Sequence, residues 1–246
     1  PGCGVLVQKE LGLRTVGALD IRNQCSGFIY ALSVADQFIK TGMYKNILVI
    51  GAETQSPALD MSTRGRNMAV LFGDGAGAAV VSRSDDSARG ILSTHLHSQG
   101  EHATELAMIT PGVGTKWVPQ ILAENDPNDV SYYPYMNGQF VFKNAVVRFA
   151  EVIEEGLKAN GLSREDISIL IPHQANYRIS QFVQHQFKLS DEQMFNNIMK
   201  YGNTTAASVP IALTEAVQQG RIKEGDLVVL AAFGSGFTWG SAIIRW

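Results

Sequence analysis

The chain has 246 residues, of which 45% are apolar, and its formal net charge is only −3. A chain of this size and composition can bury a sizeable core in one or two domains. No lysine and arginine run supports nucleic-acid binding, and no apolar run is long enough to cross a bilayer. The two cysteines, Cys3 and Cys25, do not form the pattern of a small stapled secreted fold, so we expect no disulfide and a reducing, cytoplasmic setting.

Helix-like and strand-like patterns alternate along the chain. In chain order they predict a short helix at the start, a strand-like stretch over 16–21, a helix over 26–42, strands over 46–51 and 76–82, a helix over 140–159, a strand over 167–171, a helix over 207–220, and strands over 227–232 and 241–244. Continuous apolar runs such as NILVIG and ISILI are typical of buried parallel strands. The alternation indicates an α/β fold with a mostly parallel sheet.

A weak internal repeat divides the chain into two similar halves. A helix containing Ala31-Leu32 is followed by an apolar strand and a Gly-rich strand, and the same order returns after Ala212-Leu213. We therefore expect two pseudo-symmetric α/β halves, 1–83 and 84–246. The helix starts near Cys25 and Asn203 are equivalent positions in this repeat, and symmetry would bring both to the middle of the molecule.

Cys25 lies where the strand-like stretch over 16–21 gives way to a helix. Unpaired N–H groups and the positive dipole end at a helix start favour thiolate, which is the attacking form of cysteine. The small residues Ser26 and Gly27 would allow a substrate to come close. The alternative is an inert buried cysteine.

Two further polar stretches follow or precede apolar segments. His173 comes directly after ISILIP, at the carboxyl end of a buried strand, where open α/β sheets place their ligands. Asn203 lies just before a predicted helix, where it could cap the helix and still donate through its NH₂ group. The alternatives are a structural histidine and a simple cap. Together with Cys25 these groups form a plausible set for acyl transfer through a thioester.

Two other features bear on the chemistry of the chain. Residues 233–237 form a Gly-rich turn between strands, where backbone N–H groups could bind a developing oxyanion. His95, His97 and His102 have no further partner at metal-site spacing, so no metal site is predicted, and alternating exposure along a strand would explain them.

The stretches around these residues resemble β-ketoacyl-acyl-carrier-protein synthase III, a condensing enzyme of the thiolase superfamily. The similarity covers almost the whole chain and is most specific at PHQAN, GNT and GFTWGSA. The Cys-His-Asn set separates the chain from elongating synthases, which use Cys-His-His, and from thiolases, which use a second cysteine. The resemblance implies a thiolase-like α/β fold with central mixed sheets. The family's leading βαβ portion has no counterpart here, so we expect an incomplete N-terminal half with open strand edges and apolar surface.

The resemblance also implies a reaction, a decarboxylating condensation that starts fatty-acid or related chains. Cys25 would take an acyl group from acyl-CoA, which is a substrate, and no cofactor is implied. His173 and Asn203 would donate hydrogen bonds to the thioester carbonyl of malonyl-acyl-carrier protein as CO₂ leaves, and the carbanion would attack acyl-Cys25. The N–H groups of Cys25 and Ser235 would form the oxyanion hole.

Further site residues follow only from the resemblance. Arg64 would stack on the adenine of CoA, Gly138 and Asn176 would contact pantetheine, and Lys143 and Arg178 would attract the acidic carrier protein. For the last two, a solvated surface is the alternative. A homodimer is also implied.

Residues 110–135 show no clear period and are longer than the corresponding region of the family, which leaves their role open. Two other functions stay open as well. The same three groups could transfer an acyl group to a hydroxyl or amine, or hydrolyse a thioester, and the chain could be a non-catalytic module that binds a carrier protein.

Overall fold

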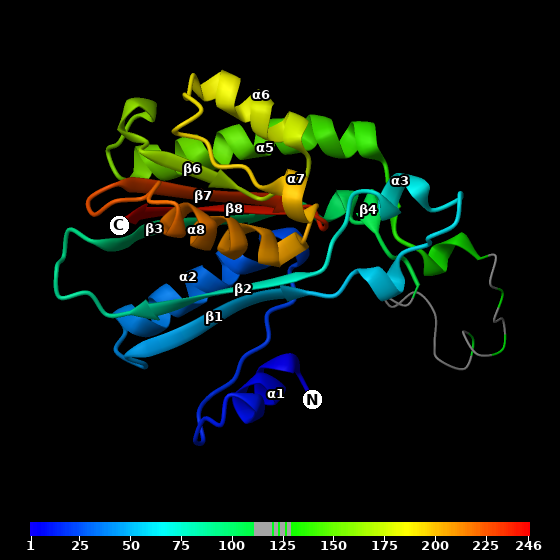
Figure 1. The fold of residues 1–246 in the computed structure, drawn as a ribbon, viewed down its shortest axis with the longest axis horizontal. Helices are drawn as coiled ribbons and strands as arrows, with labels where there is room; N and C mark the ends of the chain where they lie inside the picture. The colour runs from blue at the N-terminus through cyan, green and yellow to red at the C-terminus, as the bar shows by residue number, and fades with distance from the viewer. Residues whose placement is uncertain (111–119, 121–122, 124–125, 127–128) are drawn as a thin grey trace.

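The computed structural model describes residues 1–110, 120, 123, 126 and 129–246, in which layers of helix and sheet alternate (Figure 1). The helices are α1 (Cys3–Glu10), α2 (Gly27–Lys40), α3 (Arg66–Ala69), α5 (Gly138–Ala159), α6 (Tyr177–Phe187), α7 (Ile198–Tyr201) and α8 (Ser208–Gln218). The strands are β1 (Asn46–Glu53), β2 (Gly75–Ser82), β3 (Gly90–Ser98), β4 (Leu106–Ala107), β5 (Tyr135–Met136), β6 (Ile169–Pro172), β7 (Leu227–Gly234) and β8 (Thr238–Arg245). Most of the loop predicted over 110–135 lies outside the described residues.

A four-stranded sheet with the order β3-β8-β7-β6 forms the centre of the molecule. Helices α5 and α6 cover one face of this sheet, and α2 and α8 cover the other (Figure 1). The β1–β2 pair packs against the far side of α2 and α8, and α1 lies beyond that pair. None of the helices in the described part of the chain is long and apolar enough to span a bilayer.

The strand directions differ from the first expectation. Only β6 and β7 are parallel among the paired strands described, whereas β7–β8, β8–β3 and β1–β2 are antiparallel. The prediction of a mostly parallel sheet is therefore wrong. The turn over 235–237 that joins β7 to β8, for example, is too short for the crossover that parallel strands need. The β1–β2 pair follows α2 as the β7–β8 pair follows α8, in the order that the repeat predicts. The division of the chain near residue 83 stays a prediction.

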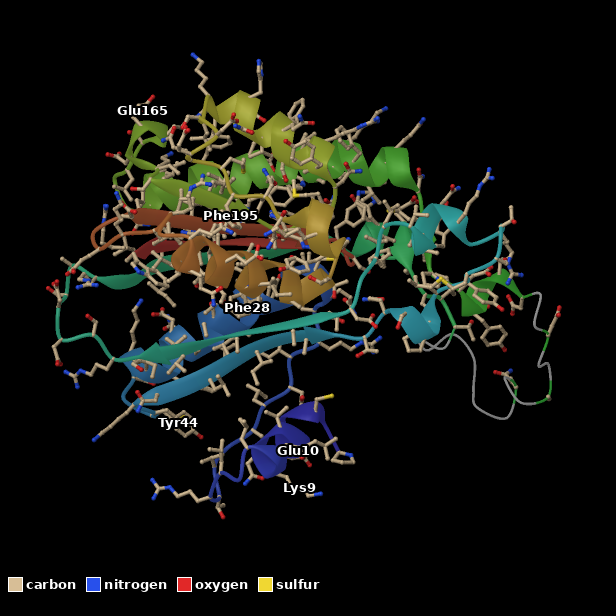
Figure 2. All side chains as sticks on the ribbon, viewed as in Figure 1. Lys9, Glu10, Phe28, Tyr44, Glu165 and Phe195 are labelled. Carbon is tan, nitrogen blue, oxygen red and sulfur yellow. The ribbon has the colours of Figure 1, made fainter. Side chains whose placement is uncertain are left out.

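Apolar side chains fill both faces of the four-stranded sheet. Phe149, Ile153 and Val183 are fully buried between the sheet and helices α5 and α6. Phe28 and Phe195 are buried on the opposite face, within the layers shown in Figure 2. Strand β7 is buried along its whole length, which explains why its sequence is a continuous apolar run without alternation.

The outer side of the β1–β2 pair is open. Leu48, Ile50 and Val80 are exposed there, and each strand of the pair has one edge without a partner among the described residues. The stretch over 16–21 is not a strand, which corrects the prediction, because no described strand lies beside it to form a ladder. Open strand edges and apolar surface are thus present, as the resemblance implied.

The sequence pattern missed several elements, of which β3 and α6 are the longest. Strand β3 forms the edge of the large sheet beside β8, and its residues are half-buried almost throughout, so they show no clear apolar alternation. Helix α6 was also missed, although Ile179, Val183 and Phe187 recur at four-residue spacing and are buried. Its start is capped by Asn176, whose Oδ1 accepts a hydrogen bond from the N–H of Arg178 at 3.0 Å.

Close packing at Gly51 predicts a measurable loss of stability on substitution. A Cβ atom at Gly51 would lie 2.5 Å from the carbonyl oxygen of Ala206, in the turn that precedes α8. We expect Gly51→Ala to lower the free energy of unfolding by about 1–3 kcal/mol in urea titrations, because backbone must move to admit the methyl group. Gly100→Ala is the control, since nothing lies within 4 Å of its added Cβ. Equal stability of the two variants would contradict the packing argument.

Candidate active site

A cavity of about 610 Å³ brings the three predicted catalytic side chains together. Cys25 comes from the turn before α2, His173 directly follows β6, and Asn203 comes from the turn before α8. Residues of α5 and the end of β7, including Gly234, complete the lining. The three groups are far apart in sequence, and the layered fold places them around one space.

Cys25 lies in a single 3-10 turn, Gln24–Ser26, that leads directly into α2. Its side chain is buried, and burial raises the pKa of the thiol to about 12, with the nearby charge of Glu53 acting in the same direction. Hydrogen bonds from the backbone N–H groups of Ser235 and Cys25 oppose this rise. The backbone donors thus act toward thiolate, as expected, but desolvation outweighs them, so the net shift of the thiol pKa is upward.

The turn between β7 and β8 lies directly against Cys25. A Cβ atom at Gly234 would lie 2.4 Å from Cβ and 2.8 Å from Sγ of Cys25, so no side chain fits at this position. The next residue, Ser235, is anchored by its hydroxyl, which donates to the carbonyl of Leu106 at 2.5 Å. The backbone N–H of Ser235 is thus fixed beside the sulfur. Its role as an oxyanion-hole donor stays a prediction.

His173 is buried and has two different nitrogen environments. Its Nδ1 lies 2.6 Å from Oγ of Ser208, whereas its Nε2 is buried without a hydrogen-bond partner among the described residues. Burial lowers the pKa of the imidazole to about 3. His173 is therefore neutral at neutral pH, and its free nitrogen is available to a ligand in the cavity.

Asn203 presents its amide nitrogen without an acceptor in the described structure. Its Oδ1 accepts from the N–H of Thr205 at 2.9 Å, so the side chain does cap the following turn. Its backbone is fixed by hydrogen bonds to Leu71 and Gly73, which precede β2. The cap occupies the oxygen and leaves the NH₂ group as a donor.

The residues assigned to CoA and carrier-protein contacts are not all at the cavity. Gly138, Asn176, Lys143 and Arg178 line it. Arg64 is not among its lining residues: its Nε donates to Oδ2 of Asp60 at 2.6 Å, and its guanidinium lies 4.2 Å from the ring centroid of Tyr133. Arg64 therefore already has an aromatic partner from the segment before α5.

The three histidines of the 95–102 region do not take part in this site. His95 and His97 share a face of β3 and both contact Glu155 of α5, at 3.3 Å and 2.6 Å. The shared face is what alternation along a strand implies, since residues two apart point the same way. The expected alternation of exposure is not seen, because the residues of β3 are half-buried almost throughout. Among the described residues, no group of three or more potential ligands could hold a metal ion.

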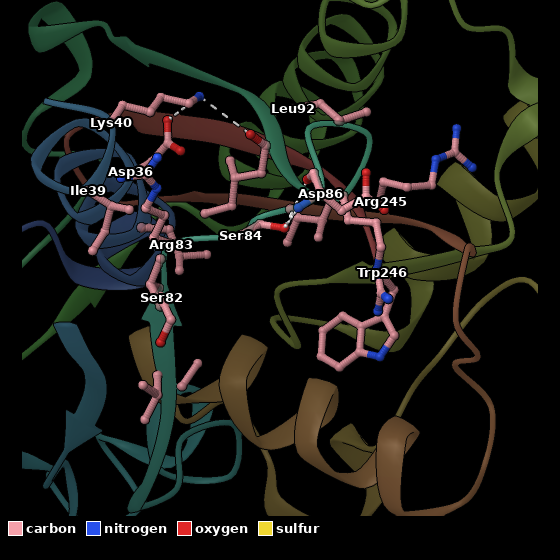
Figure 3. A pocket seen from close by; sticks show the side chains of 18 of the residues that line it. Asp36, Ile39, Lys40, Ser82, Arg83, Ser84, Asp86, Leu92, Arg245 and Trp246 are labelled. Atoms are coloured by element: carbon pink, nitrogen blue, oxygen red, sulfur yellow. Dashed lines mark hydrogen bonds and ion pairs between the residues drawn. The ribbon is translucent and has the colours of Figure 1, made fainter. Parts of the chain in front are cut away.

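A larger cavity, of about 1090 Å³, lies at the other end of α2, between that helix, the 83–89 loop and the C-terminal residues (Figure 3). An ion pair between Lys40 and Asp36 lies at its edge, with Nζ and Oδ2 2.7 Å apart. No cysteine or histidine is among the described residues that line it. The smaller cavity, which holds Cys25, is therefore the candidate for covalent chemistry.

Among the residues that sequence reasoning missed, two lie directly against the predicted catalytic groups. Gly234 was seen only as part of a Gly-rich turn, and its contact with Cys25 is a long-range feature of the fold. Ser208 follows Asn203 by five residues and looks like an ordinary helix-start serine in the sequence, yet it holds His173.

Comparison with known proteins assigns the chain to a family. Residues 19–100 match the model of 3-oxoacyl-[acyl-carrier-protein] synthase III, and residues 157–246 match the model of its C-terminal region. The β-ketoacyl-[acyl-carrier-protein] synthases III of Rhodospirillum centenum and Alkalilimnicola ehrlichii are both 47% identical over all of this chain, which spans 72% and 73% of their lengths. The crystal structure of the Aquifex aeolicus synthase III is 43% identical, with a TM-score of 0.88 over all of this chain and 72% of that one.

These matches confirm the thiolase-like fold with mixed sheets that the resemblance implied. The sequence identity to these relatives extends over all of this chain. It is far higher than between proteins that share only a fold. The chain belongs to the β-ketoacyl-[acyl-carrier-protein] synthase III family of condensing enzymes.

Proposed function

We propose that Cys25, His173 and Asn203 carry out the decarboxylating condensation with which an enzyme of this family starts a fatty-acid chain. The observation that carries the proposal is their convergence on one cavity, with the two potential donors, Nε2 of His173 and the amide nitrogen of Asn203, both without acceptors among the described residues. A thiol and two unsatisfied donors are what acyl transfer followed by enolate formation requires.

In the first step the sulfur of Cys25 attacks the thioester carbonyl of acyl-CoA. The thiol proton leaves with the departing thiolate of CoA, and the acyl group stays on Cys25. The oxygen of the tetrahedral intermediate takes the place next to the N–H groups of Cys25 and Ser235, which act on the sulfur in the free protein. These two donors thus compensate for the high thiol pKa by stabilising the charge that forms on attack.

In the second step malonyl-acyl-carrier protein enters the cavity. His173 and Asn203 donate hydrogen bonds to its thioester oxygen, and this oxygen gains negative charge as the carboxylate leaves as CO₂. The carbanion then attacks acyl-Cys25, and the sulfur leaves as the new carbon–carbon bond forms. All these groups belong to the chain and its thioester substrates, and the proposal includes no cofactor.

We also propose how the substrates and partners bind. Gly138 and Asn176 line the cavity and suit a pantetheine arm, and Lys143 and Arg178 lie at the same cavity and suit an acidic carrier protein. Arg64 is proposed for the CoA adenine, with Tyr133 supporting the guanidinium from one side.

A homodimer is supported by the open edges and exposed Val80 of the β1–β2 pair. Two free cysteines support a cytoplasmic setting.

The roles of the three residues predict different defects. We expect short acyl-CoAs to add acyl mass to Cys25 in the wild type, in His173→Ala and in Asn203→Ala. Release of labelled CO₂ from carboxyl-labelled malonyl-acyl-carrier protein should fall about a hundredfold or more in both His173→Ala and Asn203→Ala. Each of these variants lacks one hydrogen-bond donor to the developing oxyanion. His185→Ala, which alters an exposed histidine of α6, is the matched control.

Two outcomes would contradict these roles. Loss of acylation with CO₂ release intact would reverse the assignment of His173 and Asn203. Acyl transfer to a hydroxyl or amine, or hydrolysis, without any CO₂ release from the wild type would favour the alternative chemistry on the same cysteine.

Gly234 offers a test of the acylation step alone. We expect Gly234→Ala to slow acylation of Cys25 about a hundredfold, because the added methyl group would collide with Sγ and displace the nucleophile. The rate is measured by mass spectrometry during incubation with acyl-CoA, with Gly100→Ala as the control. Acylation of Gly234→Ala at the wild-type rate would show that the sulfur does not react from this position.

The neutral state of His173 predicts a pH dependence of stability. The folded protein keeps the imidazole neutral down to about pH 3, whereas an unfolded chain protonates it near its ordinary pKa of 6.5. The folded state therefore binds fewer protons in this range, and its stability is lost progressively as the pH falls below 6.5. We expect urea titrations from pH 6.5 to 4.5 to show this decline, and His173→Asn to flatten it. An unchanged slope in His173→Asn would contradict the buried neutral imidazole.

A further inference from the structure

The hydroxyl of Ser208 contacts the nitrogen of His173 that is turned toward the protein. Ser208 is the first residue of α8 and is buried, and its Oγ lies 2.6 Å from Nδ1 of His173. The other nitrogen, Nε2, is buried without a partner among the described residues, and His173 lines the same cavity as Cys25. One ring nitrogen thus has a protein partner, and the other is left for a ligand.

The direction of this hydrogen bond follows from a second contact. Oγ of Ser208 also accepts from the backbone N–H of Gln174 at 3.3 Å, and a backbone N–H can only donate. The hydroxyl proton of Ser208 then needs an acceptor, and Nδ1 of His173 is the one that the described residues provide. If Nδ1 carried the ring proton, the hydroxyl proton would be buried without an acceptor, which is unfavourable.

We propose that Ser208 is a positioning residue whose hydroxyl donates to Nδ1 of His173 and keeps the ring proton on Nε2, where it meets the substrate. The inference rests on the proposed function, because only Nε2–H can donate to the thioester oxygen. The opposite tautomer would present a lone pair to that oxygen and would make His173 a base. Ser208 also begins α8, whose positive dipole end disfavours an imidazolium at this point.

Nitrogen NMR of the protein labelled with ¹⁵N-histidine tests the tautomer without any substrate. The chain has five histidines, and the signals that disappear in His173→Asn identify His173. We expect the wild type to carry the proton on Nε2 from pH 5 to 8, with Nδ1 shifted as a hydrogen-bond acceptor. A proton on Nδ1 would overturn the proposal whether or not the enzyme is active.

The variant Ser208→Ala tests the consequence for the reaction. We expect it to take up acyl groups on Cys25 at the wild-type rate but to release CO₂ between about threefold and about tenfold more slowly, because one hydrogen bond that holds the donor tautomer is lost. Its Nδ1 signal should move to the position of a free acceptor. Unchanged CO₂ release together with an unchanged Nδ1 signal would overturn the role of Ser208.

Ser241→Ala is the matched control, since Ser241 is equally buried and its hydroxyl donates to the carbonyl of Val152 at 2.8 Å, away from the cavity. It should change neither the His173 signals nor CO₂ release. If the wild type releases no CO₂ at all, the proposed function fails, and the tautomer measurement still decides the proposal on Ser208. If Ser208→Ala does not fold, the wild-type spectrum decides it alone.

Discussion

Burial of Cys25 and His173 in their uncharged forms is the constraint on which the rest of the site depends. Desolvation raises the pKa of the thiol to about 12 and lowers that of the imidazole to about 3, so between these limits neither group is charged in the free protein. The proposed reaction therefore does not start from a preformed thiolate–imidazolium pair. In that reaction charge is stabilised as it forms, and we propose the N–H of Ser235 and the ring of His173 as donors that are already in place.

The layered fold brings the three side chains of the site together because each lies at the end of a different element. Cys25 lies in the 3-10 turn before α2, Asn203 precedes α8, and His173 follows β6. Close backbone approach keeps the ends together: Gly234 lies against Cys25, and Gly51 lies against the turn that leads into α8. A side chain at either glycine would separate layers that meet at the cavity. The positions of the site residues therefore depend on how closely α2 and α8 pack between the two sheets.

Much of this arrangement could be predicted from local patterns, and the rest depended on contacts between distant segments. The helices beginning near Cys25 and Asn203 and the apolar strand before His173 were predictable because their apolar spacing and end residues are local. The directions of the strands were not, since apolar runs do not distinguish parallel from antiparallel burial. The net shift of the thiol pKa could not be predicted, because the helix start is visible in the sequence and the depth of burial is not. Ser208 was missed because its contact with His173 joins the start of α8 to the end of β6.

In the proposed reaction, neutrality of the donors also decides what becomes of the carbanion. A charged imidazolium at His173 would be an acid strong enough to protonate the carbanion formed when CO₂ leaves, and the extender would be wasted. A neutral ring that donates through Nε2 and the amide of Asn203 both stabilise the enolate oxygen without offering an acidic proton. Desolvation therefore has two effects. It keeps Cys25 in the thiol form, and by keeping His173 neutral it favours carbon–carbon bond formation over protonation of the carbanion. Fixed N–H donors offset the slow attack of a thiol with a high pKa. No hydrogen-bond donor could restore the carbanion once it had been protonated.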